Sequence, residues 1–171
     1  YRFAADEIRE TTVVLNGDIL TDIDIEAVLN FHRSKGSEAT LVLAPVEDPS
    51  RYGLVETGPE GEILHFLEKP KPEDLAELGV NTINAGIYVL EPSILDLLKM
   101  GENQSFEYEV FPKILERKMP FYAYIMKGEY WRDIGTPASY LEAHHDFLDG
   151  TIRGFEIDRS GTSDIATAAE V

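Results

Sequence analysis

The order of elements at the start of the chain constrains the fold most, because it alternates strand, loop, helix and strand. Residues 11–15 are a short, nearly all-apolar and β-rich run, typical of a strand buried on both faces. After the polar segment 16–18, apolar residues recur at helical spacing over residues 25–32, and Asp24 can cap that helix. Residues 39–44 form the next strand. This order predicts an α/β sandwich with parallel strands.

Apolar segments separated by turn residues continue along the chain. Further strands are expected at residues 52–57, 62–67, 82–90 and 121–126, and further helices at residues 93–99 and 105–118. The turn between the first two of these strands is rich in Gly and Pro, which predicts a hairpin. Pro112 starts or kinks the second helix, because proline cannot donate a backbone hydrogen bond.

Asp133 lies at a second junction between a strand and a helix. Thr136 can cap the helix that follows, and Pro137 suits its first position. Gly135 allows backbone or ligand to come close. In open α/β sheets, ligands bind outside the carboxyl ends of strands, which makes Asp133 a candidate ligand-binding residue. The sequence around it leaves a second interpretation open, in which Asp133 only hydrogen-bonds the turn.

Composition narrows the classes of ligand. The 171 residues carry a formal net charge of −17 with only 15 lysines and arginines, so the surface repels DNA, RNA and anionic lipid. There is no cysteine, which removes thiol catalysis. No apolar run is long enough to span a membrane. We therefore expect a cytoplasmic protein without nucleic-acid or membrane partners, in which a phosphate-bearing ligand needs local cations or a metal.

Polar residues at the ends of strands form the candidate site. Asp18 and Asp133 are two carboxylates at strand ends, and Mg²⁺ prefers one or two carboxylates together with waters and phosphates. Lys69 stands beside Glu68, a pair that could hold a phosphate and a sugar hydroxyl. Taken singly, each of these motifs also fits a turn or a surface ion pair. Together they indicate a site for a sugar phosphate.

Five motifs give the chain a specific resemblance. They are Leu15-Asn16-Gly17-Asp18, Tyr52-Gly53-Leu54-Val55, Phe66-Leu67-Glu68-Lys69-Pro70, Asn84-Ala85-Gly86-Ile87-Tyr88 and Trp131-Arg132-Asp133-Ile134-Gly135-Thr136-Pro137. In identity, order and approximate spacing they resemble the motifs of sugar-phosphate nucleotidylyltransferases, the nucleoside-diphosphate-sugar pyrophosphorylases. Residues 107–115 and 131–148 are most similar to mannose-1-phosphate guanylyltransferases.

The resemblance implies a Rossmann-like three-layer sandwich with a mixed, mainly parallel sheet. Residues 1–148 would be the C-terminal part of the catalytic domain, and residues 149–171 a linker and the start of a left-handed β-helix, with one hexapeptide turn at 165–170. The family's Gly-rich phosphate loop precedes the matched region and does not occur in residues 1–171. We therefore expect this segment to be inactive alone and the full-length protein to be an enzyme.

The resemblance also implies the reaction and the roles of residues. A sugar 1-phosphate, mannose 1-phosphate in this subfamily, joins a nucleoside triphosphate, here GTP, and pyrophosphate is released. Asp18 and Asp133 would bind Mg²⁺, and Lys69 would neutralise the sugar phosphate. The remaining substrate-binding residues would be Gly17, Gly53, Glu68 and Asn84. The enzyme is expected to be a homo-oligomer.

Two alternatives remain from the sequence. Asp22-Ile23-Asp24 is an Asp-x-Asp pattern that would suit a metal-dependent glycosyltransferase, although the role of Asp24 as a helix cap explains it adequately. The other alternative is a regulatory subunit that binds nucleotide-sugar without making it. Intact Asp18, Lys69 and Asp133 argue against that interpretation.

Overall fold

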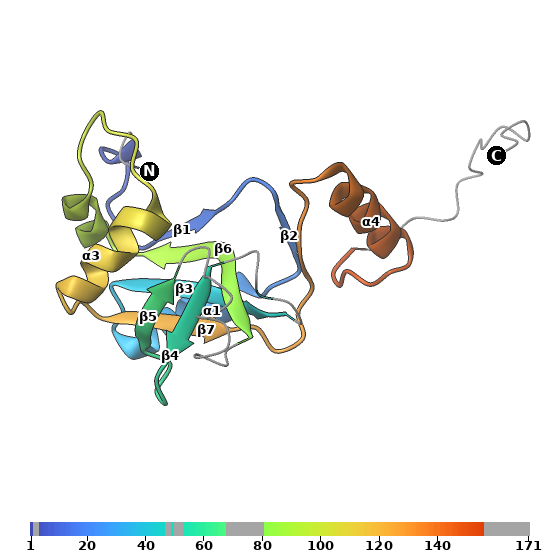
Figure 1. Ribbon diagram of the computed structural model, residues 1–171, viewed down its shortest axis with the longest axis horizontal. Coiled ribbons are helices and arrows are strands. Elements are labelled where there is room, and N and C mark those ends of the chain that lie inside the picture. The colour runs from blue at the N-terminus through green and yellow to red at the C-terminus, as the bar shows by residue number, and fades with distance from the viewer. Residues whose placement is uncertain (2–3, 47–48, 50–52, 68–80, 156–171) are drawn as a thin grey trace, which may run out of the picture.

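A six-stranded mixed sheet forms the centre of the molecule (Figure 1). The computed structural model describes residues 1, 4–46, 49, 53–67 and 81–155. The strands of the sheet are β1 (Thr12–Leu15), β3 (Ala39–Pro45), β4 (Leu54–Thr57), β5 (Ile63–Leu67), β6 (Thr82–Leu90) and β7 (Phe121–Ile125). Their order is β5-β4-β6-β3-β7, and β1 also pairs with β6. The expected mixed sheet is confirmed.

The sheet is mixed, as expected, but the pairing of its described strands is mainly antiparallel and not mainly parallel. β1, β3, β4 and β7 run in one direction, and β5 and β6 run in the other. However, β6 lies between β1 and β3, so that among the described strands only β3 and β7 are parallel neighbours. β1 is half-buried rather than buried on both faces, and Leu15 is 49% exposed. This follows because no described strand pairs with the outer edge of β1.

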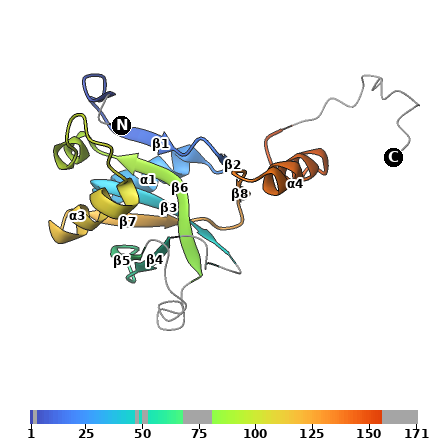
Figure 2. The same ribbon diagram turned by 45° about the horizontal axis from the view of Figure 1, so that its top comes forward.

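Helices cover the two faces of the sheet, which gives three layers (Figure 2). Helix α1 (Ile25–Lys35) packs on one face, and a 3₁₀ helix (Pro92–Leu97) and helix α3 (Phe111–Glu116) pack on the other. Alternate residues of β3 serve the two faces, as the pleat of a strand requires. Leu41 and Leu43 join the cluster around α3, whereas Val42 and Ala44 join the cluster around α1.

Local signals in the sequence predicted α1 correctly. The Asp24 carboxylate accepts a hydrogen bond of 3.1 Å from the Ala27 backbone N–H, and Gly36 ends the helix with a φ of +56°. Val28 and His32 are buried on the predicted face. The His32 ring is 2.8 Å from the Thr40 hydroxyl on β3, so the helix is tied to the sheet by polar as well as apolar contacts.

The helix expected at residues 105–118 is divided into two parts. A π-helical turn (Phe106–Val110), capped by Ser105, precedes α3. Pro112, the second residue of α3, has no backbone N–H for an i→i−4 bond. The wider i→i−5 bonds, such as that from the Val110 N–H to the Ser105 carbonyl at 3.3 Å, accommodate the change. The expected kink is therefore a π-helical turn, a feature often found at functional sites.

A smaller unit lies beside the main sheet. β2 (Ile19–Thr21) and β8 (Trp131–Asp133) form an antiparallel pair, and α4 (Pro137–Leu148) follows them and stands to one side in Figure 1. Thr136 caps α4 and Pro137 opens it, as predicted. Among the described residues, no helix combines the length and apolar character that a membrane-spanning segment needs. The hexapeptide turn expected at residues 165–170 lies outside the described residues.

The carboxylate of Asp22, which directly follows β2, forms hydrogen bonds with two segments that are distant in the sequence. It accepts a hydrogen bond of 2.7 Å from the Tyr130 backbone N–H and further bonds from the backbone and side chain of Arg153 at 3.0 and 3.1 Å. Its side chain is only 2% exposed. Burial raises the pKa of Asp22, but the hydrogen bonds and charge of Arg153 outweigh burial and hold that pKa below its ordinary value.

Arg153→Met is expected to destabilise the protein near neutral pH and to have a smaller effect in acid. A carboxyl with a lowered folded-state pKa stabilises the fold above its unfolded-state pKa of about 4, and this contribution disappears as the pH falls through the folded-state pKa. Urea unfolding near pH 7 and near pH 3 measures both effects. Arg117→Met, exposed after α3, is the control. Equal destabilisation at both pH values would contradict the assigned ion pair.

Candidate active site

The pairing of β2 with β8 brings the two predicted metal ligands together. Ile19 pairs with Asp133, and the Ile134 N–H donates to the Asp18 carbonyl at 2.8 Å. Asp18 directly precedes β2, and Asp133 is the last residue of β8. Two residues separated by 115 positions in the sequence are therefore adjacent across one short ribbon.

Gly135 marks the space that the two carboxylates share. A Cβ atom at Gly135 would lie 2.9 Å from Asp133 Oδ1 and 3.5 Å from Asp18 Oδ2. The sum of these distances is an upper limit on the separation of the two oxygens. Asp133 Oδ1 also accepts a hydrogen bond of 2.7 Å from the Gly135 N–H. A side chain at this position would enter the space between the carboxylates, and glycine keeps that space open.

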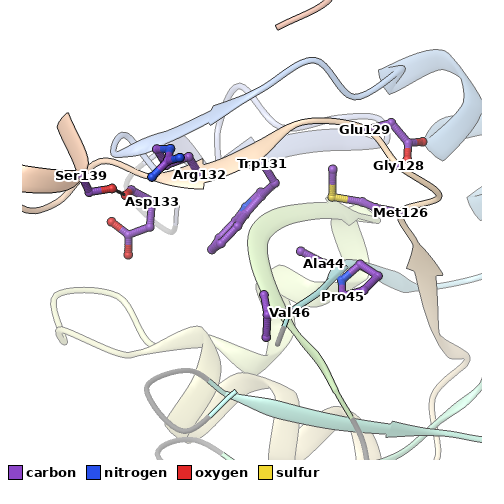
Figure 3. Close-up of a pocket in the computed structure, with 10 residues that line it drawn as sticks. All are labelled: Ala44, Pro45, Val46, Met126, Gly128, Glu129, Trp131, Arg132, Asp133 and Ser139. Atoms are coloured by element: carbon purple, nitrogen blue, oxygen red, sulfur yellow. Dashed lines mark hydrogen bonds between the residues drawn. The ribbon is translucent and has the colours of Figure 1, made fainter. Parts of the chain in front are cut away.

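An open cavity of about 810 Å³ is lined in part by Asp133 (Figure 3). Trp131 and Asp133 lie on one side of β8 and face it, whereas the guanidinium of Arg132 points to the other side. Ala44 and Met126 supply part of the apolar lining. The Trp131 indole N–H donates to the Ala85 carbonyl at 2.8 Å, so that Trp131 forms a wall of the cavity and joins β8 to β6.

The guanidinium of Arg132 is engaged by α4. It lies 2.5 Å from Glu142 and 2.7 Å from Asp146, and its Nε donates to the Tyr130 hydroxyl at 2.9 Å. Hydrogen bonds from Tyr130 and Arg132 hold the pKa of Asp146 below its ordinary value. Arg132 is the one cation among the described residues that line the cavity. Because its charge is balanced by α4, it positions this helix rather than offering a free charge to a phosphate.

Asn84 lies beside Gly53, next to a bulge in β6. Between its pairings with Leu41 and Leu43, β6 carries two more residues than β3, which is a bulge at Ala85 and Gly86. The Asn84 backbone N–H donates to the Gly53 carbonyl at 3.0 Å. The structure therefore brings together two residues that the sequence predicts in one sugar pocket.

Gly86 connects this bulge to the loop that carries Asp18. Its φ is +73°, and its carbonyl accepts a hydrogen bond of 2.9 Å from the Asn16 N–H. A Cβ at Gly86 would lie 2.8 Å from the Asn16 side chain, so both the backbone angle and the close approach require glycine. Gly17 follows Asn16 and is exposed, with no described atom within 4 Å of the position of its Cβ.

Two predicted site residues lie outside the described residues. They are Glu68 and Lys69, and their roles remain predictions. Conversely, the sequence did not single out Tyr88 or Glu107 as individual site residues. The hydroxyl of Tyr88 bonds both Asn84 and Glu107 at 3.0 Å. The spacing of Asn84 and Tyr88 gave no signal for this contact, because residues four apart in an extended strand are about 13 Å apart and only the bulge between them shortens that distance.

The carboxylates at Gly135 fit a hard divalent cation. Among the described residues there is no group of three or more acidic, His or Cys side chains with metal-binding geometry, so a closed protein cage is not built from this part of the chain. Mg²⁺ commonly takes one or two carboxylates and completes its shell with water and substrate phosphates. Asp133, which lines the cavity, and Asp18, which meets it at Gly135, offer that donor set.

Comparison with known proteins identifies the family. The sequence model described as nucleotidyl transferase matches residues 1–150. The chain belongs to this family. Within the nucleotidyl transferase family, similar curated relatives are sugar-phosphate nucleotidyltransferases. The family expected from the motifs therefore agrees with the family whose model matches residues 1–150.

Three relatives illustrate the match. UTP–glucose-1-phosphate uridylyltransferase of Synechocystis sp. is 38% identical over 150 residues, and the match covers 86% of this chain and 38% of that protein. Mannose-1-phosphate guanylyltransferase of Mycobacterium tuberculosis is 37% identical over 142 residues, with 82% and 38% covered. The structure of HddC from Yersinia pseudotuberculosis complexed with GMP-PN is 26% identical, with a TM-score of 0.67 and coverage of 85% and 60%. The chain thus spans well under half the length of these two curated relatives.

The Asp-x-Asp pattern has structural roles in this fold. Asp22 is held by Arg153 and the Tyr130 backbone, and Asp24 caps α1. Neither carboxylate is among the described residues that line the cavity beside Asp133. These contacts explain the pattern without a metal, as the helix-cap interpretation of Asp24 predicted.

Proposed function

We propose that the full natural protein joins mannose 1-phosphate to GTP in a Mg²⁺-dependent reaction that yields GDP-mannose and pyrophosphate. The observation that carries the proposal is the meeting of Asp18 and Asp133 at Gly135, beside the cavity. Membership of the nucleotidyl transferase family supports the reaction class. The similarity to a mannose-1-phosphate guanylyltransferase and to a structure complexed with GMP-PN supports the choice of substrates.

The chemistry requires positioning more than proton transfer. A phosphate oxygen of the sugar 1-phosphate attacks the α-phosphorus of the nucleotide, and the bond from that phosphorus to the bridging oxygen of the β-phosphate breaks. The leaving group is pyrophosphate. Because the attacking phosphate is already anionic, no general base is needed. The barrier comes largely from the repulsion of two anions and from their alignment, which a site lowers by charge neutralisation and orientation.

Each site residue has a role in this scheme. Asp18 and Asp133 hold Mg²⁺, which when bound neutralises phosphate charge at this edge of the cavity. Lys69 binds the sugar phosphate and Glu68 accepts hydrogen bonds from sugar hydroxyls. The Asn84 amide and the backbone at Gly53 and Gly17 complete the pocket. Gly135 keeps the carboxylates close to the space that the metal needs.

Product analysis tests this proposal. We expect the full natural protein to release pyrophosphate fastest from mannose 1-phosphate with GTP, when each common sugar 1-phosphate is paired with each nucleoside triphosphate. A preference for glucose 1-phosphate with UTP would overturn the choice of substrates and leave the reaction class standing, since one relative is a uridylyltransferase. Formation of a nucleoside diphosphate from a nucleotide-sugar would instead indicate a glycosyltransferase.

A regulatory subunit is the second candidate. It would bind GDP-mannose without releasing pyrophosphate from any pairing of substrates. The convergence of Asp18 and Asp133 favours catalysis over this role, because a subunit that only binds nucleotide-sugar has no need to hold two carboxylates at the position of a metal. Equilibrium binding of GDP-mannose, measured together with the turnover assays, separates the two functions.

A further inference from the structure

A chain of hydrogen bonds runs from the π-helical turn to the bulge in β6. The Asn84 side-chain Nδ2 donates to the Tyr88 hydroxyl at 3.0 Å, and that hydroxyl donates to Glu107 Oε1 at 3.0 Å. The Ser105 hydroxyl donates to the other oxygen of Glu107 at 2.6 Å. We call Asn84, Tyr88 and Glu107 the Tyr88 relay.

The direction of each bond in the Tyr88 relay is determined by Glu107. An ionised carboxylate can only accept, so it takes the single hydroxyl proton of Tyr88. The Tyr88 oxygen must then accept, which turns the NH₂ group of Asn84 toward it. The opposite side of the amide, Oδ1, accepts a hydrogen bond of 3.1 Å from the Gly86 N–H. Only one of the two amide orientations satisfies both neighbours.

Packing keeps the relay rigid. Tyr88 is 1% exposed, and its ring contacts Phe106 and Phe111 at centroid distances of 5.7 and 5.2 Å. Glu107 lies in the π-helical turn, where the Ser105 hydroxyl also accepts from the Glu107 backbone N–H at 3.1 Å. The aromatic cluster therefore fixes the position of the Tyr88 hydroxyl, and that hydroxyl in turn orients the Asn84 amide.

The half-buried amide of Asn84 retains capacity for a ligand. One of its two N–H groups goes to Tyr88, and one of the two lone pairs on Oδ1 goes to Gly86. Asn84 also touches Gly53 through its backbone, at the predicted sugar pocket. No other described residue bonds the second N–H or the second lone pair, and the order of these two groups along the pocket depends on which way the amide is turned.

We propose that Tyr88 and Glu107 are positioning residues that fix the Asn84 amide in the orientation that receives a sugar 1-phosphate. The proposal rests on the proposed function, because it takes Asn84 as a sugar contact. Loss of the Tyr88 hydroxyl removes one of the two described bonds that orient the amide, so that only the Gly86 N–H then opposes a half rotation that exchanges a donor for an acceptor. The Tyr88 relay therefore affects binding of the sugar phosphate and leaves binding of the nucleotide unchanged.

Tyr88→Phe removes the hydroxyl and preserves the buried ring. In the full natural protein, with Mg²⁺ and saturating GTP, we expect KM for mannose 1-phosphate to rise about tenfold, which corresponds to about 1.4 kcal/mol. KM for GTP and the melting temperature should change little. If another sugar 1-phosphate supports faster turnover, the same assay uses that substrate. Tyr108→Phe is the matched control, because Tyr108 lies in the same π-helical turn and is 57% exposed.

Two further variants distinguish positioning from a general structural effect. Glu107→Gln should keep KM near the wild-type value, because the new amide can present its carbonyl oxygen to Tyr88, whereas Glu107→Ala should resemble Tyr88→Phe. In an Asn84→Ala background, Tyr88→Phe should add no further change in KM, since the relay acts only through Asn84. Effects of Tyr88→Phe and Asn84→Ala that simply add would overturn the proposal.

The remaining outcomes separate the relay from the proposed function. If Asn84→Ala raises KM for the sugar phosphate and Tyr88→Phe does not, the relay is wrong and the proposed function stands. If Asn84→Ala leaves KM unchanged in an active enzyme, Asn84 is not a sugar contact and the relay proposal fails with it. Absence of turnover with every sugar 1-phosphate refutes both proposals.

Discussion

Asp133→Asn is expected to lower Mg²⁺-dependent turnover of the full natural protein by about 10³-fold. Asparagine keeps the size of the side chain, and its carbonyl oxygen can still accept the hydrogen bond from the Gly135 N–H. The substitution therefore mainly removes the negative charge of the Asp133 carboxylate. A metal ion supplies several kcal/mol of charge stabilisation to phosphoryl transfer, and each 1.36 kcal/mol is tenfold in rate. Pyrophosphate release as a function of Mg²⁺ concentration measures the effect.

Asp24→Asn is the matched control. Asparagine caps helices about as well as aspartate, so that α1 should remain intact and turnover should stay at the wild-type level. This control also tests the Asp-x-Asp interpretation, which predicts a loss of metal-dependent activity for the same variant. If Asp133→Asn retains near-normal turnover at equal Mg²⁺ concentration, Asp133 is not a metal ligand. A lowered melting temperature without lost turnover would restrict Asp133 to the turn.

The elements that the sequence predicted best are those whose signals act over a few residues. Asp24 and Gly36 bound α1, and Thr136 and Pro137 open α4, as expected. A cap satisfies backbone groups in its own first or last turn, so that the residue type alone determines it. Such signals needed no knowledge of the rest of the fold.

Strand order depends on contacts that no local pattern records. Residues 12–15 and 39–45 are apolar and run parallel, as predicted, yet β6 separates them. A buried central strand and a buried parallel neighbour have the same apolar composition. Pro112 indicated a kink, but it did not indicate the wider hydrogen bonding of the π-helical turn or the packing of Phe106 and Phe111 against Tyr88.

In the candidate site, too, the sequence indicated local features but not the contacts between distant segments. The sequence predicted Asp18 and Asp133 as residues at strand ends, but their meeting depends on the pairing of β2 with β8. Each of these strands has only three residues, too few for an alternating pattern to stand out. The contact between Asn84 and Tyr88 likewise depends on a bulge that shifts the register of β6 against β3.

Gly135→Ala is expected to lower turnover by about 10²-fold while the protein remains folded. Its Cβ would lie 2.9 Å from Asp133 Oδ1 and must displace that oxygen from the space it shares with Asp18. The carboxylate is the end of a side chain and can move, so the cost to folding is small. A misplacement of about 1 Å in a catalytic group can cost about 10²-fold in rate. Turnover, Mg²⁺ dependence and the melting temperature should be measured on the same preparation.

Gly58→Ala provides a control of the same chemical kind. A Cβ at Gly58, in the turn between β4 and β5, would also meet a carboxylate, that of Glu62. It lies away from the described residues that line the cavity, so turnover should stay at the wild-type level. If higher Mg²⁺ concentration partly restores Gly135→Ala, the displaced carboxylate acts through the metal. Unchanged turnover in Gly135→Ala would show that the space at Gly135 is not needed for catalysis.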